Sequence, residues 1–373
     1  MEGMIYLADG TLYKGKGFGT SATRVGELVF NTSMTGYQGI LTDPSYKGQI
    51  INMTYPLIGN YGVSNIDNQS ECIHAFGFVT RDISYRPYNR MNKRTILEWL
   101  EEQGVPGVYY VDTRSITKKI RAEGTLPCVI STEGIDREEA ASLLKKTTLR
   151  VDYMKDVGTR EVKHTPADGY RIAILDLGIK RNIIDSLQKR GCEIYLFPYG
   201  TSPAEILACK PDGFFLSNGP GDPEAATEAV ETARVLMQQL PTFGICMGHQ
   251  LLALATGGST YKLKFGHRGA NHGVYDRVTD KSAITSQNHS FAVDAASVEK
   301  KGMIITHINL NDQTVEGMRH RELPVFSVQY HPEGYPGPND SEGLFDRFME
   351  MIKACKEGTF VPGTDVKGGA AHA

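Results

Sequence analysis

The chain has 373 residues, of which 40% are hydrophobic and 22% are charged, a composition typical of folded globular proteins with two or three domains. Its formal net charge of −3 at pH 7 argues against a general affinity for nucleic acid or for an anionic membrane surface. No apolar run approaches the roughly 20 residues that span a bilayer, and the N-terminus lacks the basic and apolar regions of a secretory signal.

The first 150 residues predict a mixed α/β domain. Strands are expected at 5–12 and 26–31, with a glycine-rich stretch between them that is followed by no helix and therefore predicts a hairpin and not a phosphate-binding loop. Residues 31–46 are rich in Gly, Pro, Asn and Thr, and from composition alone we expect a loop there. Helices are expected at 94–103, from Asp112 onward, and at 137–146.

The second half has a more regular pattern. Residues 151–170 have the composition of a linker, and a second domain is expected at 171–357. Short apolar runs alternate with helical patterns, which predicts parallel βαβ units and a doubly wound sheet whose ligands bind at the carboxyl ends of the strands. A strand-rich region follows residue 257, a C-terminal helix is expected at 341–356, and residues 358–373 are expected to form a mobile tail. The expected strands are 172–176, 194–197, 213–217, 242–245 and 324–330, and the expected helices are 179–190, one from Ser202, 223–239 and 247–256.

The sequence around Cys246 indicates a nucleophile. A short apolar run ends in Gly-x-Cys-x-Gly, with Gly244 and Gly248 on either side of the cysteine, and a helical pattern begins at once. This arrangement is typical of a nucleophile elbow, a tight strand-to-helix turn that glycines make possible. A cysteine at a helix N-terminus is favoured as a thiolate by the helix dipole and by free backbone N–H groups.

A nucleophilic cysteine needs a base, and the base needs a group that orients it. His331 and Glu333 offer both, because residues i and i+2 of an extended segment face the same side. Each residue alone is more often structural, and Cys246 alone could be a small core residue. Taken together at strand ends, the three residues favour catalysis.

The loop 218–223 follows a predicted strand of the same sheet. It could be a simple turn, or it could present backbone N–H groups to a developing oxyanion. Metal binding is not expected at Asp276 or at the histidines, because they show no H-E-x-x-H or comparable spacing. The six cysteines are scattered without a C-x-x-C pair, so we expect neither zinc nor a disulfide framework, and a reducing cytoplasm fits best. The histidines considered are His249, His267, His272, His289 and His307.

Three motifs of the second half together resemble the class I, triad-type glutamine amidotransferases. They are Ser-Asn-Gly-Pro-Gly-Asp-Pro at 217–223, Gly-Ile-Cys-Met-Gly-His-Gln at 244–250 and His-Pro-Glu at 331–333. In the first half, residues 31–38, 41–46 and 55–60 resemble the small, glutamine-hydrolysing subunit of carbamoyl-phosphate synthetase, as do residues 264–269 and 287–291. The resemblance covers nearly the whole chain, and it implies a flavodoxin-like amidotransferase domain after the N-terminal domain.

The resemblance implies a role for each matching residue. Cys246 would attack the side-chain amide of glutamine and form a γ-glutamyl thioester, with His331 as general base and then acid, and Glu333 as its orienter. The N–H groups of Met247 and Gly219 would form the oxyanion hole. The chain has Ser290 where the family often has Gly, and Met247 where it often has Leu. The residues implied to hold glutamine are Ser45, Gly221, Gln250, Asn288, Ser290 and Phe291. Because Ser45 belongs to the N-terminal domain, the site would lie near the domain interface.

The resemblance also implies a partner. The chain contains no convincing ATP loop, so ATP and Mg²⁺ are expected on a large subunit, and no cofactor or metal is expected in this chain. Ammonia released here would pass to that subunit, in a heterodimer or a higher assembly, and serve arginine or pyrimidine synthesis. Two alternatives remain open: the amidotransferase of another synthetase, such as those for anthranilate, GMP or CTP, and a flavodoxin-like binding module with an inactive site.

Overall fold

The computed structural model describes residues 1–363, and the chain divides into two compact units, Met1–Val151 and Asp152–Ala373. Each unit has its own buried hydrophobic clusters. No helix within residues 1–363 is both long enough and apolar enough to cross a membrane.

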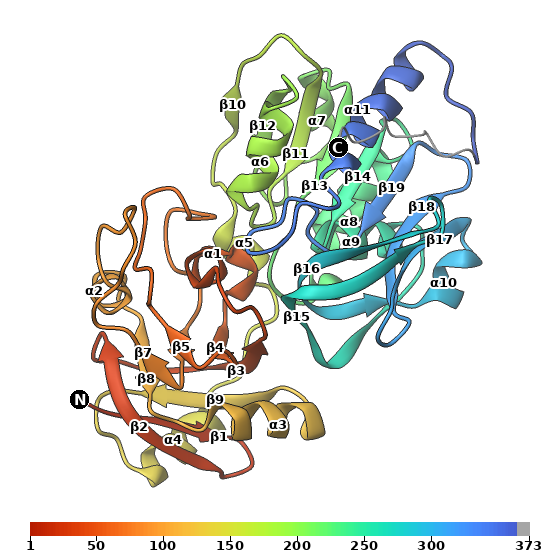
Figure 1. The fold of residues 1–373 in the computed structure, drawn as a ribbon. Coiled ribbons are helices and arrows are strands. Elements are labelled where there is room, and N and C mark those ends of the chain that lie inside the picture. The colour runs from red at the N-terminus through yellow and green to blue at the C-terminus, as the bar shows by residue number, and fades with distance from the viewer. Residues whose placement is uncertain (364–373) are drawn as a thin grey trace. The chain divides into compact units, whose positions relative to one another are not determined.

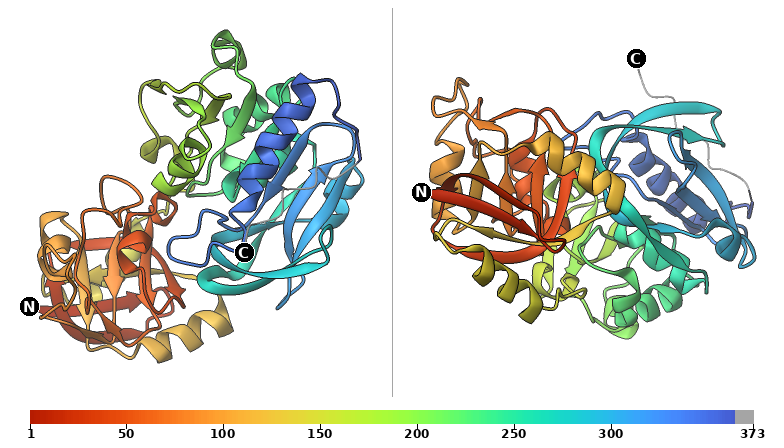
Figure 2. Two further views of the ribbon diagram at one scale, coloured as in Figure 1. Left: turned by 45° about the horizontal axis from the view of Figure 1, so that its top comes forward. Right: turned by 90° about the horizontal axis from the view of Figure 1, so that it is seen from below.

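The first unit is built on a closed barrel (Figures 1 and 2). Its strands follow one another around the barrel in the order β1-β2-β8-β6-β4-β3-β9. Strands β3, β4, β6 and β8 are parallel neighbours, and the other pairs in the ring are antiparallel. Closure leaves the barrel without an unpaired edge. The strands are β1 (Glu2–Leu7), β2 (Leu12–Gly19), β3 (Thr23–Asn31), β4 (Gln49–Met53), β6 (Gly77–Val79), β8 (Pro106–Tyr109) and β9 (Leu126–Ser131), with a separate pair β5 (Leu57–Ile58) and β7 (Asp82–Ile83).

Local capping explains where three of the helices described in the first unit begin. Thr95 and Asp136 each form a capping box with the glutamate three residues on, and Asp112 accepts a hydrogen bond from the Ser115 backbone N–H at 2.9 Å. The predicted helices are therefore confirmed to within about two residues at the starts. The helices are α1 (Tyr37–Thr42), the 3₁₀ turn η1 (Pro44–Tyr46), α2 (Ile96–Glu102), α3 (Thr113–Glu123) and α4 (Arg137–Lys146).

The loop predicted for residues 31–46 is wrong in its second half, where α1 and η1 lie. All six residues of α1 are buried, and Tyr37, Ile40 and Leu41 join the core cluster of the unit. Packing of this apolar face stabilises a helix that its Gly- and Thr-rich composition disfavours.

The second unit is a doubly wound sheet, as predicted. Its parallel part has the order β12-β11-β13-β14-β19, which is the flavodoxin-like order 2-1-3-4-5. Antiparallel strands β18, β17, β15 and β16 extend the sheet beyond β19, and β10 forms the other edge. The strands are β10 (Lys163–Thr165), β11 (Arg171–Leu175), β12 (Glu193–Phe197), β13 (Gly213–Leu216), β14 (Thr242–Ile245), β15 (Thr260–Asp276), β16 (Lys281–Val293), β17 (Met303–Asn309), β18 (Val315–His320) and β19 (Val325–Val328).

Two helical layers cover this sheet (Figure 1). On one face, residues of α7, α8 and α9 pack with Ala173, Phe214 and Leu216, and on the other face α6 and α11 pack with Ile174 and Phe215. Neighbouring residues of a strand point to opposite faces of the sheet, and here both faces are covered by helices. Residues on both faces of such a strand are therefore buried, which explains the continuous apolar runs in the sequence. The helices are α5 (Met154–Val157), α6 (Arg181–Gln188), α7 (Pro203–Ala208), the 3₁₀ turn η2 (Pro223–Ala225), α8 (Thr227–Leu236), α9 (Met247–Ala255), α10 (Ala295–Glu299) and α11 (Gly343–Lys356).

Residues 152–170, which we expected to be a linker, lie within the second unit. Met154 of α5 is fully buried in its core, and β10 pairs with β12. The start of the expected tail is also ordered, since Phe360 packs against the core and Arg319 donates to the Gly363 carbonyl at 2.8 Å. The rest of that tail, residues 364–373, lies outside the described residues.

Candidate active site

Cys246 lies at the turn between β14 and α9, as the elbow motif predicts. Its backbone has φ 55° and ψ −104°, a conformation that side-chain-bearing residues rarely adopt. The Cys246 N–H donates to the Val328 carbonyl at 2.9 Å, so the end of β19 holds the turn in place. A strained and well-fixed turn at the carboxyl end of the sheet is the geometry of a nucleophile elbow.

The two glycines of the elbow allow α9 to pack closely on the sheet. A Cβ atom on Gly248 would lie 2.3 Å from the Leu216 carbonyl oxygen of β13, and one on Gly244 would lie 2.8 Å from the Gly248 backbone. Neither contact is sterically possible without movement of backbone. The Gly-x-Cys-x-Gly spacing is therefore a requirement of packing as well as of the turn.

His331 and Glu333 lie together and are buried, as is Cys246. His331 Nδ1 is 2.7 Å from Glu333 Oε1, and the His331 backbone N–H donates to the Ser286 carbonyl of β16 at 2.9 Å. His331 Nε2 is buried and has no hydrogen-bond partner among the described residues, and Cys246 is one of the groups that raise the pKa of the ring. The ring is thus held through Nδ1 and leaves Nε2 available to the thiol.

Lys180 completes this group, and sequence reasoning missed it. Its Nζ lies 2.9 Å from Glu333 Oε1 and donates to the Gly334 carbonyl at 2.7 Å, although its side chain is only 2% exposed. Lys180 comes from the loop that follows β11, far from Glu333 in sequence. The tethered cation compensates a buried carboxylate that would otherwise be costly.

The charges of this group support one another. Burial alone would raise the pKa of Glu333, but Lys180 and His331 hold it well below its ordinary value. Burial alone would lower the pKa of His331, but the Glu333 carboxylate raises it above its ordinary value. Glu333 is therefore ionised, and His331 is a strong proton acceptor for a neighbouring thiol.

The loop 218–223 lies beside the elbow. Asn218 Oδ1 accepts from the Lys180 backbone N–H at 3.1 Å, and the Gly248 N–H donates to the Ser217 carbonyl at 3.0 Å. A Cβ on Gly219 would lie 2.2 Å from the Leu177 carbonyl oxygen, so only glycine fits. Met247 begins α9, so its N–H belongs to the first turn, where helical N–H groups lack an intrahelical acceptor.

The central part of β16 borders the cysteine. The Cys246 thiol donates to the Asn288 carbonyl at 3.6 Å, and Gln250 Nε2 of α9 donates to the Phe291 carbonyl at 3.0 Å. Ser290, which stands where the resembled family often has Gly, accepts a side-chain hydrogen bond from Arg268. The structure thus brings Cys246, Gln250, Asn288 and Phe291 into contact, with the pair His331–Glu333 also buried in the second unit. The predicted contacts of these residues, and of Gly219, Gly221, Met247 and Ser290, with glutamine stay predictions.

Ser45 lies in the first unit, within η1. It is 6% exposed, and its N–H donates to Asp43 Oδ1 at 2.9 Å. Its predicted contact with glutamine stays a prediction.

Comparison with known proteins gives matches to two families and to full-length relatives. The family described as glutamine amidotransferase class-I matches residues 173–351, and the family described as carbamoyl-phosphate synthase small chain, CPSase domain, matches residues 5–130. The carbamoyl phosphate synthase small chain of Clostridium acetobutylicum is 55% identical over 94% of this chain and 100% of its own length, and that of Listeria monocytogenes is 48% identical over 95% and 98%. A solved structure, a glutamine amidotransferase from Thermotoga maritima, is similar over 51% of this chain and 84% of its own, at 15% identity and a TM-score of 0.37.

Residues 173–351, which lie within the second unit, match the class I glutamine amidotransferase family, so this unit is a class I glutamine amidotransferase domain. Because full-length relatives and both family models agree, the chain belongs to the carbamoyl phosphate synthase small chain family.

Proposed function

We propose that this chain is the glutamine-hydrolysing subunit of a carbamoyl phosphate synthase, and that it supplies ammonia to a large, ATP-dependent subunit. The observation that carries the proposal is the buried arrangement of Cys246, His331 and Glu333 at the elbow, with Lys180 behind it. A binding module with an inactive site has no need for a compensated buried ion pair behind a strained cysteine.

The chemistry follows from this arrangement. His331 Nε2 takes the thiol proton, and Cys246 Sγ attacks the amide carbon of glutamine. The N–H groups of Met247 and Gly219 stabilise the oxyanion. The C–N bond then breaks as His331 returns its proton to the leaving nitrogen, which gives ammonia and a γ-glutamyl thioester. Water, deprotonated by His331, hydrolyses the thioester to glutamate and regenerates the thiol.

Glutamine would be held by residues around this centre. In the proposal, Gly221, Gln250 and the 288–291 segment of β16 contact the substrate, and Ser45 of the first unit adds a further contact. The large subunit binds ATP and Mg²⁺ and makes carbamoyl phosphate from bicarbonate, two ATP and the ammonia, for arginine or pyrimidine synthesis in the cytoplasm. A sheltered route is needed because free ammonia in water near pH 7 is mostly protonated and no longer nucleophilic.

Replacement of the nucleophile tests the proposal. In the complex purified with its natural partner, Cys246→Ser should abolish carbamoyl phosphate synthesis from glutamine while synthesis from added ammonium persists. An alkylating glutamine analogue should label the wild-type chain at Cys246 and leave the variant unlabelled. Undiminished glutamine-dependent synthesis by the variant would refute the role of Cys246, and co-purification of a different synthetase would point to another amidotransferase.

A further inference from the structure

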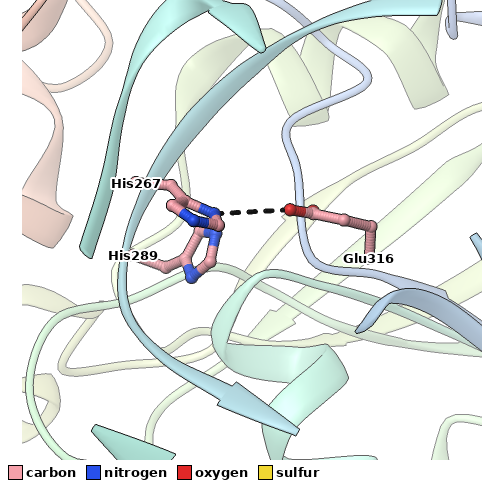
Figure 3. A group of neighbouring side chains, drawn as sticks. All are labelled: His267, His289 and Glu316. Atoms are coloured by element: carbon pink, nitrogen blue, oxygen red, sulfur yellow. Dashed lines mark ion pairs between the residues drawn. The ribbon is translucent and has the colours of Figure 1, made fainter. Parts of the chain in front are cut away.

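A second buried group of ionisable side chains lies outside the catalytic centre. His267 of β15, His289 of β16 and Glu316 of β18 are all buried, and their nitrogen and carboxylate oxygen atoms lie within 4.8 Å of one another (Figure 3). His267 and His289 are directly opposite residues of the β15–β16 ladder. Buried charge of this kind needs a partner for each group.

Such a trio could suggest a metal site, but its donor atoms already have protein partners. Glu316 Oε1 accepts from Asn309 Nδ2 at 2.8 Å, and Glu316 Oε2 accepts from Gln287 Nε2 at 3.0 Å. His289 Nδ1 lies 2.8 Å from the Phe291 carbonyl oxygen, and His289 Nε2 lies 2.9 Å from Gln287 Oε1. A metal ion requires several free lone pairs that converge on one point, and this group does not offer them.

His267 itself supplies the positive charge of the group. Its Nε2 lies 2.7 Å from Asp312 Oδ2, and its Nδ1 lies 3.4 Å from Glu316 Oε1, so both nitrogens face carboxylates. Burial alone would lower the pKa of His267, but the two carboxylates raise it to about 9. The ring is therefore an imidazolium at neutral pH, held between two negative charges.

A continuous series of contacts links this charge to the catalytic centre. Glu316 fixes the Gln287 amide, Gln287 contacts His289, and His289 Nδ1 reaches the Phe291 carbonyl. That same carbonyl accepts from Gln250 Nε2 at 3.0 Å. Between these anchors lies Asn288, whose carbonyl accepts the Cys246 thiol.

We infer that the buried His267 and Glu316, together with the more exposed Asp312, form a charge cluster that positions the 288–291 segment of β16 for glutamine recognition. The inference rests on the proposed function and assigns positioning residues that touch neither the substrate nor Cys246. The cluster orients Gln287 and His289, and these fix the Phe291 peptide. Loss of the cluster should therefore weaken binding of glutamine more than it slows the chemistry at the thiol.

The test is Glu316→Gln, which keeps the shape of the side chain and removes its charge. The amide can present either end to Gln287, so the orientation of Gln287 and His289 is no longer fixed. In the full-length chain with its natural partner, KM for glutamine should rise roughly tenfold or more while kcat changes less than about threefold. Asp312→Asn, whose side chain is 42% exposed, should give a smaller rise and is expected to fold even if Glu316→Gln does not.

Glu193→Gln is the matched control, because it also removes a carboxylate that contacts a histidine. Glu193 Oε1 lies 2.8 Å from His164 Nε2, between β12 and β10 of the same unit. Its KM should stay at the wild-type value, and ammonium-dependent synthesis should be normal in all three variants. An unchanged KM in folded Glu316→Gln and Asp312→Asn would overturn the positioning role, as would a stoichiometric metal ion in the purified wild-type chain. If instead the wild-type chain hydrolysed no glutamine and resisted labelling at Cys246, the proposed function itself would fail.

Discussion

At the scale of single residues, Lys180 shows how a site can depend on a side chain that no motif announces. The Cys246 turn and the His331–Glu333 spacing were predictable because each is a local pattern with a known geometry. Lys180 could not be found in this way, since only folding brings the loop after β11 to Glu333. One lysine among the 40 basic residues of the chain carries no signal of its own.

Lys180→Met keeps the length of the side chain and removes its charge. Glu333 would remain buried with only His331 as partner, so its pKa would rise and its hold on the His331 ring would weaken. We expect glutamine hydrolysis to fall by roughly 10- to 100-fold and the free energy of unfolding to fall by about 3–5 kcal/mol. Steady-state kinetics and urea denaturation measure the two effects.

Lys356→Met is the control for this prediction. Lys356 also contacts a carboxylate, Asp212, at 2.6 Å, but its side chain is 53% exposed. Exposed ion pairs contribute little, so this variant should keep activity and nearly all stability. Equal behaviour of the two variants would contradict the role given to Lys180.

His267 makes stability depend on pH in a defined direction. Its pKa is about 9 in the folded chain and near 6.5 when exposed, so its contribution is fully present below 6.5 and is lost as the pH rises through 9. The free energy of unfolding should therefore be higher for the wild-type chain than for His267→Asn. This difference should be largest near pH 6 and smaller at pH 9.5. Denaturant titrations at both pH values check this, and a constant difference would show that His267 is not charged in the fold.

At the scale of elements, the strands and helices of the second unit were predictable because periodicity and capping agree. Ser202 and Glu205 form a capping box at the start of α7, where a helix from Ser202 was predicted, and β14 has the bounds the sequence indicated. Helix α1 was missed because buried packing, and not propensity, stabilises it. The long β15–β16 hairpin was expected only as a strand-rich region, since its register shifts leave no simple alternation.

The close packing of α9 on β13 at Gly248 gives a prediction at the scale of elements. In Gly248→Ala, the added methyl group would have to move the Leu216 backbone, so both the turn and the sheet edge would shift. We expect the variant to lose about 2 kcal/mol or more of stability and most of its glutaminase activity. Gly343→Ala at the start of α11 is the matched control, because nothing lies within 4 Å of its added Cβ. Thermal unfolding and glutamine hydrolysis should be near wild type in that control.

At the scale of the whole molecule, a barrel unit accompanies the amidotransferase unit, and the family match extends over both. The closed barrel was not predictable, because its parallel and antiparallel pairs join strands that are distant in sequence. The composition predicted that the first domain ends at residue 150, and the first compact unit ends at Val151. The stretch that follows lies in the second unit and not in a linker. Edge strands such as β10 are short and polar, so they resemble linkers in sequence.

Ser45→Ala tests whether the barrel unit takes part in glutamine recognition. If the Ser45 hydroxyl contacts the substrate, its loss should raise KM for glutamine severalfold with little change in ammonium-dependent synthesis. Ser33→Ala is the control, because Ser33 is also buried in the barrel unit and its hydroxyl has no partner among the described residues. A KM equal to that of the control would remove Ser45 from the site.

At Cys246, the positive φ that the cysteine must adopt lowers the stability of the fold, while the cysteine side chain is needed for activity. Glycine would adopt φ 55° without strain, whereas cysteine is kept there for its sulfur. Selection for a more stable chain and selection for hydrolysis therefore act in opposite directions on this codon. A relative that no longer needs to split glutamine is expected to tolerate glycine at this position and to gain stability from it.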